Sequence, residues 1–567
     1  MSFKINDRVR DRGGSRGTVK YIGTVATSTK NPDFVWIGVQ WDDPSRGKHD
    51  GETGGVRYFR CDKNTSGSFA KPKKLTRAAG FLEMLQERYE EDDTKGNFKI
   101  KDGARSIEAT FDGEEGRSFE VTLVGVEKIK KRQKLDVIER VSLESSNFGI
   151  AGENADRIGK MCPNLRELHA PETLIGCWSE IAKIVLQLPK LEILNLSRNR
   201  IAEFMSPKIE MSTFSNLRAL ILNRTGISWT QVSKLERAIP KLERLHICGN
   251  DLRLLGLQKE EKEDTKKFEN LKMLDLSEND VEWKEVYDFT SSLPKLECLI
   301  LNDTKIDRVE LYDVNKSSSF SNLRSLSLCG GKIHSWSTVD ELNRFPVLVS
   351  LKCSRQPELL KSLGPRQQRQ QLVARVAGLL QLNSSDVRRR ERDDAEKIYL
   401  HVVLSDAVSS DKSSSSGSKK TMNHDDNLWP EELQKMLSIS TRQSLLSQHP
   451  RLLELLRRHG LPPSLRSKSS GDAKMQGMVS LILRSMATVS ISKEPRTQRV
   501  PLRMKVGDLK RLCARFFKVP QSQQRLKYRE ADDFSVPEEL DDDKSVLAYY
   551  GVADGGTIFI HDDGDRK

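Results

Sequence analysis

The segment Leu191-x-x-Leu194-x-Leu196-x-x-Asn199-x-Ile201 decides the fold of the middle of this 567-residue chain. Its leucines alternate with other residues, as a short β-strand requires when one of its faces is buried. The side chain of an asparagine at the ninth place bonds backbone groups and turns the chain out of the strand. The segment therefore predicts a strand followed by a tight turn.

The same apolar frame recurs along the chain. It begins again at Leu217, Leu242, Leu271, Leu296 and Leu323, with weaker copies at Ile138, Leu165 and Leu348. Successive frames start 25 to 29 residues apart, which is the spacing of leucine-rich repeats. The ninth place is held by Asn199, Asn250 and Asn279, with Thr225 and Thr304 as substitutes. The pattern predicts an α/β leucine-rich-repeat solenoid over residues 135–360.

A helical phase follows the strand within each repeat, as in the segment from Trp229 to Ile239 that precedes Pro240. A tryptophan opens this phase in four repeats: Trp178, Trp229, Trp283 and Trp336. Such a row could form a ligand platform, but its strict phase favours packing against the next repeat. We therefore interpret these tryptophans as scaffold.

Nine strands at roughly 4.8 Å spacing would line a concave face of about 40 Å, which suits a folded protein better than a small molecule. The residues between the frame leucines point into this face. They include Glu192, Glu243 and Glu297 together with basic residues, and this mixture of signs argues against a nucleic-acid groove. The candidate contacts for a protein partner are Arg218, Arg244, Lys272 and Arg324.

Residues 1–77 hold short apolar runs broken by glycines, which predicts a small all-β domain. Its motifs are Phe34-Val35-Trp36-Ile37-Gly38-Val39, Gly47-Lys48-His49-Asp50-Gly51, Tyr58-Phe59 and Gly67-x-Phe69. The glycines would let backbone N–H groups approach a carboxylate, and Lys48 would supply a positive charge. Phe34, Trp36 and Phe69 can form an apolar slot. A plain β-turn would use the same loop residues, so the flanking aromatics carry the functional interpretation.

This order of aromatics, glycines and lysines resembles the CAP-Gly domain over the whole segment. That family's loop is usually Gly-Lys-Asn-Asp-Gly, so His49 departs from the pattern. The resemblance implies recognition of an acidic C-terminal tail that ends in an aromatic residue, as the tail of α-tubulin does. The implied tail-binding residues are Phe34, Trp36, Gly47, Lys48, His49, Asp50, Gly51 and Phe69.

The ends of the repeat array need covering. Residues 81–134, which begin with a helix at Phe81, Leu82 and Leu85, are expected to cap the first repeat. After the last frame, residues 361–404 resemble a C-terminal cap, with an amphipathic helix at 372–380. The charge run 388–396 predicts a solvated helix rather than a phosphate site.

Residues 405–476 are expected to form a linker. Its serine-rich part, 409–418, predicts flexibility, whereas 430–459 predicts helix up to Gly460.

The last segment, 477–567, predicts an α+β fold. A strand is expected at Val489 and Ile491 and another near Val500 and Leu502. A helix follows, and the chain returns to strand near residue 557, so the order ββαββ resembles ubiquitin. One face of that helix carries Leu509, Leu512, Cys513 and Phe516. The chain ends without Gly-Gly, so we expect a ubiquitin-like, β-grasp domain that is not conjugated.

Composition limits the function classes. The formal charge is +13, and residues 1–80 hold sixteen Lys and Arg against eight Asp and Glu. No run reaches the roughly 20 apolar residues of a membrane helix, and residues 1–8 lack the core of a signal peptide. Eight cysteines include no Cys-x-x-Cys pair, so neither a zinc site nor a disulfide framework is expected. These features favour a cytoplasmic protein without a metal or another cofactor, and the CAP-Gly resemblance implies association with the cytoskeleton.

Catalytic motifs are missing from the sequence. We find no phosphate-binding loop, no His-Glu-x-x-His pair and no Gly-x-Ser-x-Gly elbow, and the nine histidines are dispersed. We therefore expect a protein that is not an enzyme.

The order CAP-Gly, leucine-rich repeats, ubiquitin-like domain resembles the tubulin-folding cofactor E family over nearly the whole chain. The resemblance implies a chaperone that binds α-tubulin, works with cofactors B, C and D, and takes part in assembly and dissociation of the αβ heterodimer. The alternatives are a CAP-Gly microtubule adaptor and a ubiquitin-pathway shuttle. We expect a monomer that binds neither nucleic acid nor membrane. The sequence leaves open whether assembly or dissociation dominates, and which partner the ubiquitin-like domain has.

Overall fold

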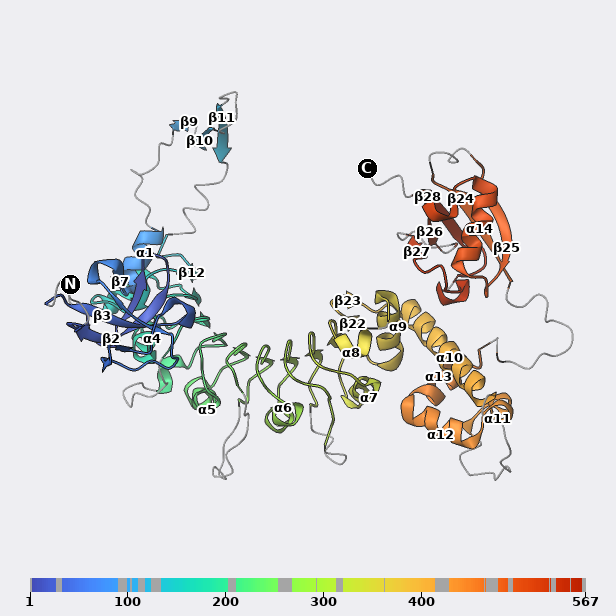
Figure 1. Cartoon of the computed structure of the whole chain (residues 1–567), viewed down its shortest axis with the longest axis horizontal. Coiled ribbons are helices and arrows are strands. Elements are labelled where there is room, and N and C mark those ends of the chain that lie inside the picture. Colours follow the sequence, from blue (N-terminus) through green and yellow to red (C-terminus); the bar gives the residue numbers. More distant parts are fainter. Residues whose placement is uncertain are drawn as a thin grey trace. The chain divides into compact units, whose positions relative to one another are not determined.

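The computed structural model divides the chain into two compact units, Met1–Leu363 with Gly378–Asp386, and Gly364–Ala377 with Val387–Lys567 (Figure 1). Among the residues that it describes, no helix is both long and apolar enough to cross a membrane. The described residues are 3–26, 33–89, 99–101, 104–110, 118–123, 134–201, 211–252, 268–291, 293–312, 320–361, 363–412, 428–462, 465, 478–487, 493–529, 531, 537–550 and 552–562.

The N-terminal part holds a short hairpin of β4 (Glu52–Thr53) and β5 (Val56–Arg57) and one five-stranded antiparallel sheet, which confirms the all-β prediction. Its strand order is β6-β3-β2-β1-β7. The strands are β1 (Arg8–Asp11), β2 (Arg16–Gly23), β3 (Trp36–Trp41), β6 (Gly67–Ala70) and β7 (Leu75–Arg77). Val9, Val19, Ile37, Val39 and Trp41 form its core, each at most 1% exposed.

The middle of the chain forms a sheet of eleven strands, of which the first ten run parallel. Nine of them begin two residues after a frame leucine or isoleucine, as predicted. They are β12 (Arg140–Ser142), β14 (Glu167–His169), β15 (Ile193–Asn195), β16 (Ala219–Ile221), β17 (Arg244–His246), β18 (Met273–Asp275), β19 (Cys298–Ile300), β20 (Ser325–Ser327) and β21 (Ser350–Lys352). β22 (Gln381–Leu382) and β23 (Ser385–Asp386) complete the sheet.

The ninth-place asparagines bond backbone groups of two repeats. Asn199 Oδ1 accepts from the Thr173 N–H at 2.8 Å, and Asn199 Nδ2 donates to the carbonyls of Ala170 at 2.7 Å and Leu196 at 3.0 Å. The side chain is 1% exposed. Because these buried backbone groups would otherwise lack partners, the asparagine holds both the turn and the contact between repeats. This confirms the predicted turn.

The eighth place of every frame has a left-handed backbone, with φ between 54° and 69°. Its nine residues are Ser145, Glu172, Arg198, Arg224, Gly249, Glu278, Asp303, Gly330 and Arg355. A left-handed residue other than glycine costs roughly 1–2 kcal/mol. Bonds between repeats offset this cost, since the Arg198 N–H donates to the Asn223 carbonyl at 2.7 Å. The sequence did not reveal this feature, because the residue types at this place differ.

Glycine at the eighth place has a second role. Arg224 forms an ion pair with Glu278 across the intervening repeat, whose eighth place is Gly249. A methyl group on Gly249 would lie 2.9 Å from the Arg224 Cγ atom, so a side chain there would obstruct the pair. The same arrangement recurs with Asp303 and Arg355, 3.1 Å apart, on either side of Gly330.

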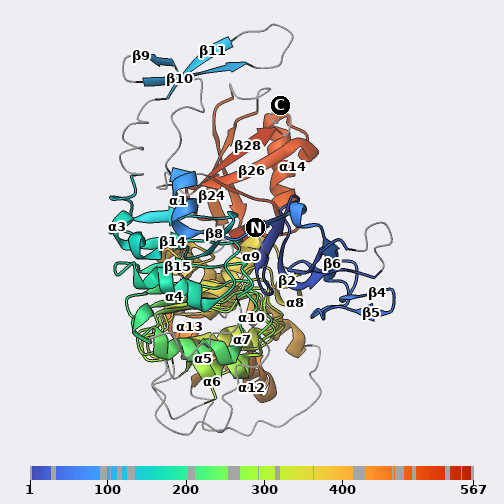
Figure 2. The same cartoon turned by 90° about the vertical axis from the view of Figure 1, so that its left-hand side faces the viewer.

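Four helices each begin at one of the four tryptophans, as predicted: α4 (Trp178–Leu186), α5 (Trp229–Ala238), α6 (Trp283–Thr290) and α7 (Trp336–Glu341). They follow one another along one side of the row of strands (Figures 1 and 2). Trp178 and Trp283 are buried, and Trp283 Nε1 donates to the Glu310 carbonyl at 2.7 Å. Packing in the core is thereby confirmed for these two tryptophans. Trp229 and Trp336 are half-buried.

The helix predicted after residue 80 packs against the first repeat. In α1 (Phe81–Tyr89), the Phe81 ring lies 5.5 Å from Phe148, and the Ser142 N–H donates to the Tyr89 hydroxyl at 2.9 Å. β8 (Ala79–Gly80) pairs with β13 (Phe148–Ile150). A second antiparallel sheet in the same segment, which the sequence did not predict, consists of β9 (Lys99–Lys101), β10 (Ala104–Thr110) and β11 (Ser118–Leu123).

Two arginines of the N-terminal sheet contact the left-handed turns of the first repeats. Arg10 donates to the carbonyls of Ser145 and Glu172, the latter at 2.8 Å. Arg16 donates to the Arg198 carbonyl at 2.7 Å. All three carbonyls belong to the eighth place of successive repeats. The sheet is therefore joined to the repeats by charge-assisted bonds to backbone oxygens.

The second unit begins with helices α9 (Pro365–Arg375), α10 (Arg389–Lys412), α11 (Glu431–Met436), α12 (Ile439–Gln448) and α13 (Leu452–His459). The helix predicted at 372–380 is wrong beyond Arg375, because Val376 is extended. The prediction of a flexible linker is wrong for residues 409–412, because α10 continues to Lys412. Ala407 and Val408 bury their side chains, and the Ser409 hydroxyl donates to the Ser405 carbonyl at 2.7 Å. Residues 413–418 lie outside the described part.

The C-terminal sheet has the order β25-β24-β28-β26-β27, with α14 (Val506–Phe517) packed on it. Its strands are β24 (Met478–Ser485), β25 (Arg496–Pro501), β26 (Gln524–Arg529), β27 (Glu538–Glu539) and β28 (Thr557–Asp562). The chain order is β24, β25, α14, β26, β27 and β28, which is the predicted ββαββ order with one additional short strand, β27, and Leu509 and Cys513 are fully buried. The strand expected at Val489 and Ile491 lies outside the described residues. The first strand is β24, which the sequence analysis missed.

Candidate functional site

The loop Gly47–Gly51 is held tightly by its neighbours. The N–H groups of Lys48 and His49 donate to the Gly67 carbonyl at 2.7 and 3.1 Å, and the Gly67 N–H donates back to His49 at 2.7 Å. A methyl group on Gly47 would collide with the Thr65 carbonyl. Gly51 has a φ of 104° and no room beside the Phe59 carbonyl. Both glycines are therefore required by the close approach of backbone.

His49 is fixed as a neutral ring. Its Nδ1 accepts from the Gly51 N–H at 3.0 Å, and its ring centre lies 5.3 Å from Phe69. Burial lowers the pKa of His49 and Lys48 lowers it further, although Asp50 acts in the opposite direction. Because Nδ1 accepts, the proton of the neutral ring is on Nε2. His49 can therefore offer one N–H donor, where the usual asparagine would offer an amide.

These contacts correct the expected role of the loop backbone. The N–H groups of Lys48, His49 and Gly51 are all used within the domain and cannot receive a carboxylate. Asp50 accepts from Arg57 at 2.9 Å, and this bond lowers the pKa of Asp50. The Lys48 ammonium is exposed and the His49 Nε2–H remains. The Lys48 and His49 side chains therefore remain as donors at this loop.

The aromatic side chains form two groups among the described residues. The rings of Phe34 and Trp36 are 5.2 Å apart, whereas Phe69 lies 5.4 Å from Tyr58 and 5.6 Å from Phe59. No ring contact joins Phe69 to the first group in the described part, so the three-ring slot stays a prediction in which the two groups would form opposite walls. The sequence analysis missed Tyr21, whose ring lies 6.0 Å from Phe69, and left Tyr58 and Phe59 out of the site. The adjacent Tyr58-Phe59 pair was the available signal.

The charged candidates on the strands are largely paired. The second place of eight successive frames alternates in sign: Glu139, Arg166, Glu192, Arg218, Glu243, Lys272, Glu297 and Arg324. Glu243 contacts Arg218 at 2.5 Å and Lys272 at 3.2 Å, and Lys272 is the larger cause of its lowered pKa. Within the described residues, Arg244 and Arg324 form no ion pair. Of the four candidates, these two keep their charge available for a partner.

Apolar side chains on the same strands were missed. Ile193, Ile221, Met273 and Ile300 flank the buried central leucines and are half-buried. We define the strand face as these four residues together with Arg244 and Arg324. Such a mixture of apolar area and isolated arginines is typical of protein-binding surfaces.

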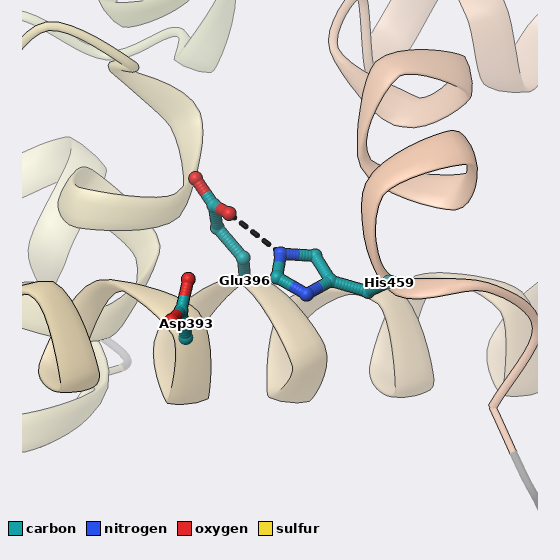
Figure 3. Close-up of side chains that lie close together, drawn as sticks. All are labelled: Asp393, Glu396 and His459. Atoms are coloured by element: carbon teal, nitrogen blue, oxygen red, sulfur yellow. Dashed lines mark hydrogen bonds and ion pairs between the residues drawn. The ribbon is translucent and has the colours of Figure 1, made fainter.

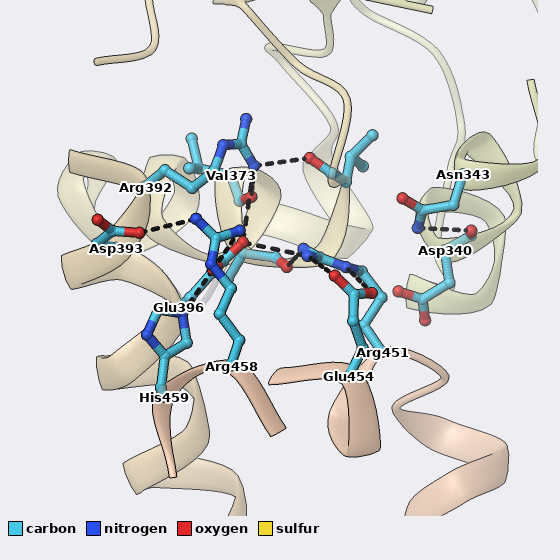
Figure 4. A network of polar contacts seen from close by, with 12 residues as sticks. Asp340, Asn343, Val373, Arg392, Asp393, Glu396, Arg451, Glu454, Arg458 and His459 are labelled. Carbon is cyan, nitrogen blue, oxygen red and sulfur yellow. Dashed lines mark hydrogen bonds and ion pairs between the residues drawn. The ribbon is translucent and has the colours of Figure 1, made fainter. Parts of the chain in front are cut away.

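One cluster in the second unit has the residue types of a metal site. Asp393, Glu396 and His459 place their possible ligand atoms within 4.8 Å of one another (Figure 3). Guanidinium groups also approach Glu396, from Arg451 at 3.1 Å and Arg458 at 3.4 Å (Figure 4). These positive charges oppose a metal cation. We therefore interpret the cluster as a buried ion-pair network, and the solvated helix predicted for 388–396 is wrong at Glu396, which is fully buried.

Three buried cysteines are unsuited to nucleophilic chemistry. All eight cysteines of the chain are free thiols. Burial raises the pKa of Cys162 to about 11 and that of Cys353 and Cys513 to about 12, so these thiols stay protonated at neutral pH.

Comparison with known proteins identifies the domains and the family. The CAP-Gly domain model matches residues 5–75, and the ubiquitin-like domain model matches residues 478–566. The tubulin-folding cofactor E of Arabidopsis thaliana is 32% identical over 577 residues, which cover 99% of this chain and 98% of the relative. The chain belongs to the tubulin-folding cofactor E family.

Other relatives agree with this assignment. The tubulin-specific chaperone E of Danio rerio is 30% identical and covers 96% of this chain and 97% of its own length. A solved structure of the C-terminal ubiquitin-like domain of mouse tubulin-specific chaperone e is 24% identical. It covers 17% of this chain and 94% of that domain, with a TM-score of 0.15. The two relatives that match nearly the whole chain, together with the two domain models, confirm the resemblance expected from the order of the modules.

Proposed function

We propose that this chain is a tubulin-folding cofactor that binds α-tubulin by its tail and by its body, and takes part in assembly and dissociation of the αβ heterodimer. Membership of the cofactor E family carries this proposal. We further infer that the middle sheet is a leucine-rich-repeat solenoid whose strand face is concave. Cofactors B, C and D are proposed as partners on the same family ground.

Tail binding is assigned to residues around the Gly47–Gly51 loop. Lys48 supplies an exposed positive charge, and the His49 Nε2–H supplies a directed donor for a terminal carboxylate. Trp36 adds a buried indole Nε1–H that has no partner within the described residues. Gly47, Asp50 and Gly51 position the loop. Phe34 and Trp36 on one side and Phe69 on the other would contact the terminal aromatic ring.

Body binding is assigned to the strand face. Its apolar residues supply area that is removed from water, while Arg244 and Arg324 supply charge. Arg218 and Lys272 remain candidates, but a client would first have to displace Glu243 from them. We propose that the protein acts stoichiometrically, by preferring α-tubulin in a state different from that in the dimer.

The decisive experiment mixes the protein with αβ-tubulin, with and without cofactor B, and follows complexes by size-exclusion chromatography. A discrete α-tubulin complex with release of β-tubulin is expected. Sedimentation with intact microtubules and no separated α-subunit would instead support a microtubule adaptor. Calorimetry with a peptide ending in Glu-Glu-Tyr tests the tail site, because an amidated control should bind much more weakly.

A further inference from the structure

The sheet of the ubiquitin-like domain has two unlike faces. In β24 the residues Val479, Leu481 and Leu483 are buried in the core beneath α14, whereas Ile482 is half-buried and Arg484 is exposed. Successive side chains of a strand point to opposite faces, so Ile482 and Arg484 belong to the face opposite α14. Met486 continues this side just after the strand and is 38% exposed.

Phe559 lies at the centre of this second face. On β28 it alternates with Ile558 and Ile560, which are core residues. Strand pairing places Arg484 on one side of Phe559 and Lys527 on the other. The Arg529 guanidinium lies over the Phe559 ring, 5.0 Å from its centre. A cation held on an aromatic face in this way is already oriented for a ligand.

The charge of this face is unbalanced. Arg484, Lys527 and Arg529 form no ion pair within the described residues. The nearby Arg525 is neutralised by Glu539 at 2.8 Å. We define the basic sheet face as Ile482, Arg484, Met486, Lys527, Arg529 and Phe559. It combines three cations with apolar side chains of the types enriched at protein interfaces.

We propose that the basic sheet face binds an acidic segment of a partner protein, with an apolar residue of that segment packed on Met486, which is 38% exposed, beside the buried Phe559 ring. Charge complementarity supplies the argument, because Arg484, Lys527 and Arg529 form no ion pair among the described residues, and Glu539, which lies opposite Lys527, is paired with Arg525. No free C-terminus is needed, which distinguishes this site from the Gly47–Gly51 loop. The proposal does not depend on the identity of the client.

A protein segment fits this face better than a nucleic acid does. Binding of single strands uses aromatic faces on which bases stack. Here the Arg529 guanidinium already covers the ring of Phe559.

The test uses the full chain and a fluorescein-labelled peptide with four glutamates around one leucine, acetylated and amidated so that it offers no terminal carboxylate. We expect saturable binding by fluorescence anisotropy, weakened at least tenfold by Arg484→Glu with Lys527→Glu. Arg515→Glu is the matched control, because Arg515 is exposed on α14, on the other side of the sheet. It should change the affinity less than threefold. Binding should also weaken with salt.

Several outcomes would overturn the proposal. The peptide could fail to bind, or Arg515→Glu could weaken its binding as much as the double variant does. Binding could also be lost with Lys48→Ala alone. Tighter binding of a single-stranded oligonucleotide, lost in the same double variant, would assign the face to nucleic acid. Concentration-dependent dimerisation that is abolished by the double variant would assign it to a second copy. Should the double variant unfold, Arg484→Gln and Lys527→Gln separately are expected to weaken binding at least threefold each.

Discussion

Arginine holds two parts of this molecule together in opposite ways. At the junction between the N-terminal sheet and the first repeats, Arg10 and Arg16 donate to neutral backbone carbonyls. Between α10 and α13, Arg451 and Arg458 surround a carboxylate, Glu396, that has no exposure to water. Removal of Arg10 or Arg16 leaves only neutral carbonyl groups without a partner. Removal of the Glu396 charge leaves a buried guanidinium without its counter-charge. The loss of unfolding free energy should therefore be much larger in the second case.

The largest effect is expected from Glu396→Gln. It leaves Arg451, which is 7% exposed, without its buried counter-charge. Breaking such a pair by removing one partner typically costs about 3–5 kcal/mol. Urea unfolding followed by circular dichroism should show this loss in the second unit. Glu454→Gln is the control, because the Glu454 side chain is 54% exposed and contacts the same arginine at 2.8 Å. Equal losses of unfolding free energy in Glu396→Gln and Glu454→Gln would contradict the distinction between a buried and an exposed carboxylate.

A smaller effect is expected from Arg10→Ala. Removal of a charged donor from backbone carbonyls costs about 1–3 kcal/mol, because water can replace part of the interaction. Hydrogen exchange should become faster in β1 and at the turns of the first two repeats. Arg12→Ala is the control, since Arg12 is exposed and its side chain forms no hydrogen bond or ion pair among the described residues. Unchanged exchange in the Arg10 variant would show that the junction does not depend on this guanidinium.

A pH effect is expected in the second unit, at His449. Nδ1 of His449 accepts from the Tyr399 hydroxyl at 2.6 Å and from Arg375 at 3.3 Å. Burial, followed by the charge of Arg375, lowers the pKa of His449 to about 4. The unfolded chain has the higher pKa, so stability is complete above about pH 6.5 and is lost as the pH falls from there towards 4.

The measurement for His449 is the free energy of unfolding between pH 7 and pH 4. His449→Gln should flatten the part of the pH dependence that this residue causes, because glutamine does not titrate. His334→Gln, in the first unit, serves as the control and should leave the profile unchanged. The same slope in His449→Gln and in the unaltered protein would contradict the assignment.

The smallest effect is expected from Arg218→Ala. This exposed side chain pairs with Glu243 at 2.5 Å, and exposed pairs typically contribute about 0.2–1 kcal/mol. Thermal unfolding should therefore change little. A loss of stability comparable to that of Glu396→Gln would mean that the alternating charges hold the repeats together. Arg218 would then be unsuitable for testing client binding.

The sequence predicted the parts of the fold that depend on a repeated pattern. Leucine frames located the strands, tryptophans located the helix starts, and asparagines such as Asn199 located the turns, because each type serves one purpose in every repeat. The eighth place was not predictable, since Glu172, Arg198 and Gly330 share only a backbone angle. Periodicity carries information about burial, whereas this turn is defined by bonds between main-chain groups.

Long-range contacts set the other limit. Glu396 lies in a charge run that is typical of a solvated helix, and the arginines that bury it come from residues 451 and 458. At the candidate site, the motif predicted which residues form the loop. It did not show that Gly67 uses the N–H groups of Lys48 and His49, because that bond depends on the pairing of distant strands.

The left-handed turns have a consequence for how this junction can change during evolution. Arg10 and Arg16 recognise carbonyl oxygens at Ser145, Glu172 and Arg198, and every residue type provides a carbonyl. Substitutions at these three positions keep the acceptors as long as φ stays positive. The repeats can therefore change in sequence at these three positions while the bonds to their carbonyls persist, so selection on these bonds falls on Arg10 and Arg16.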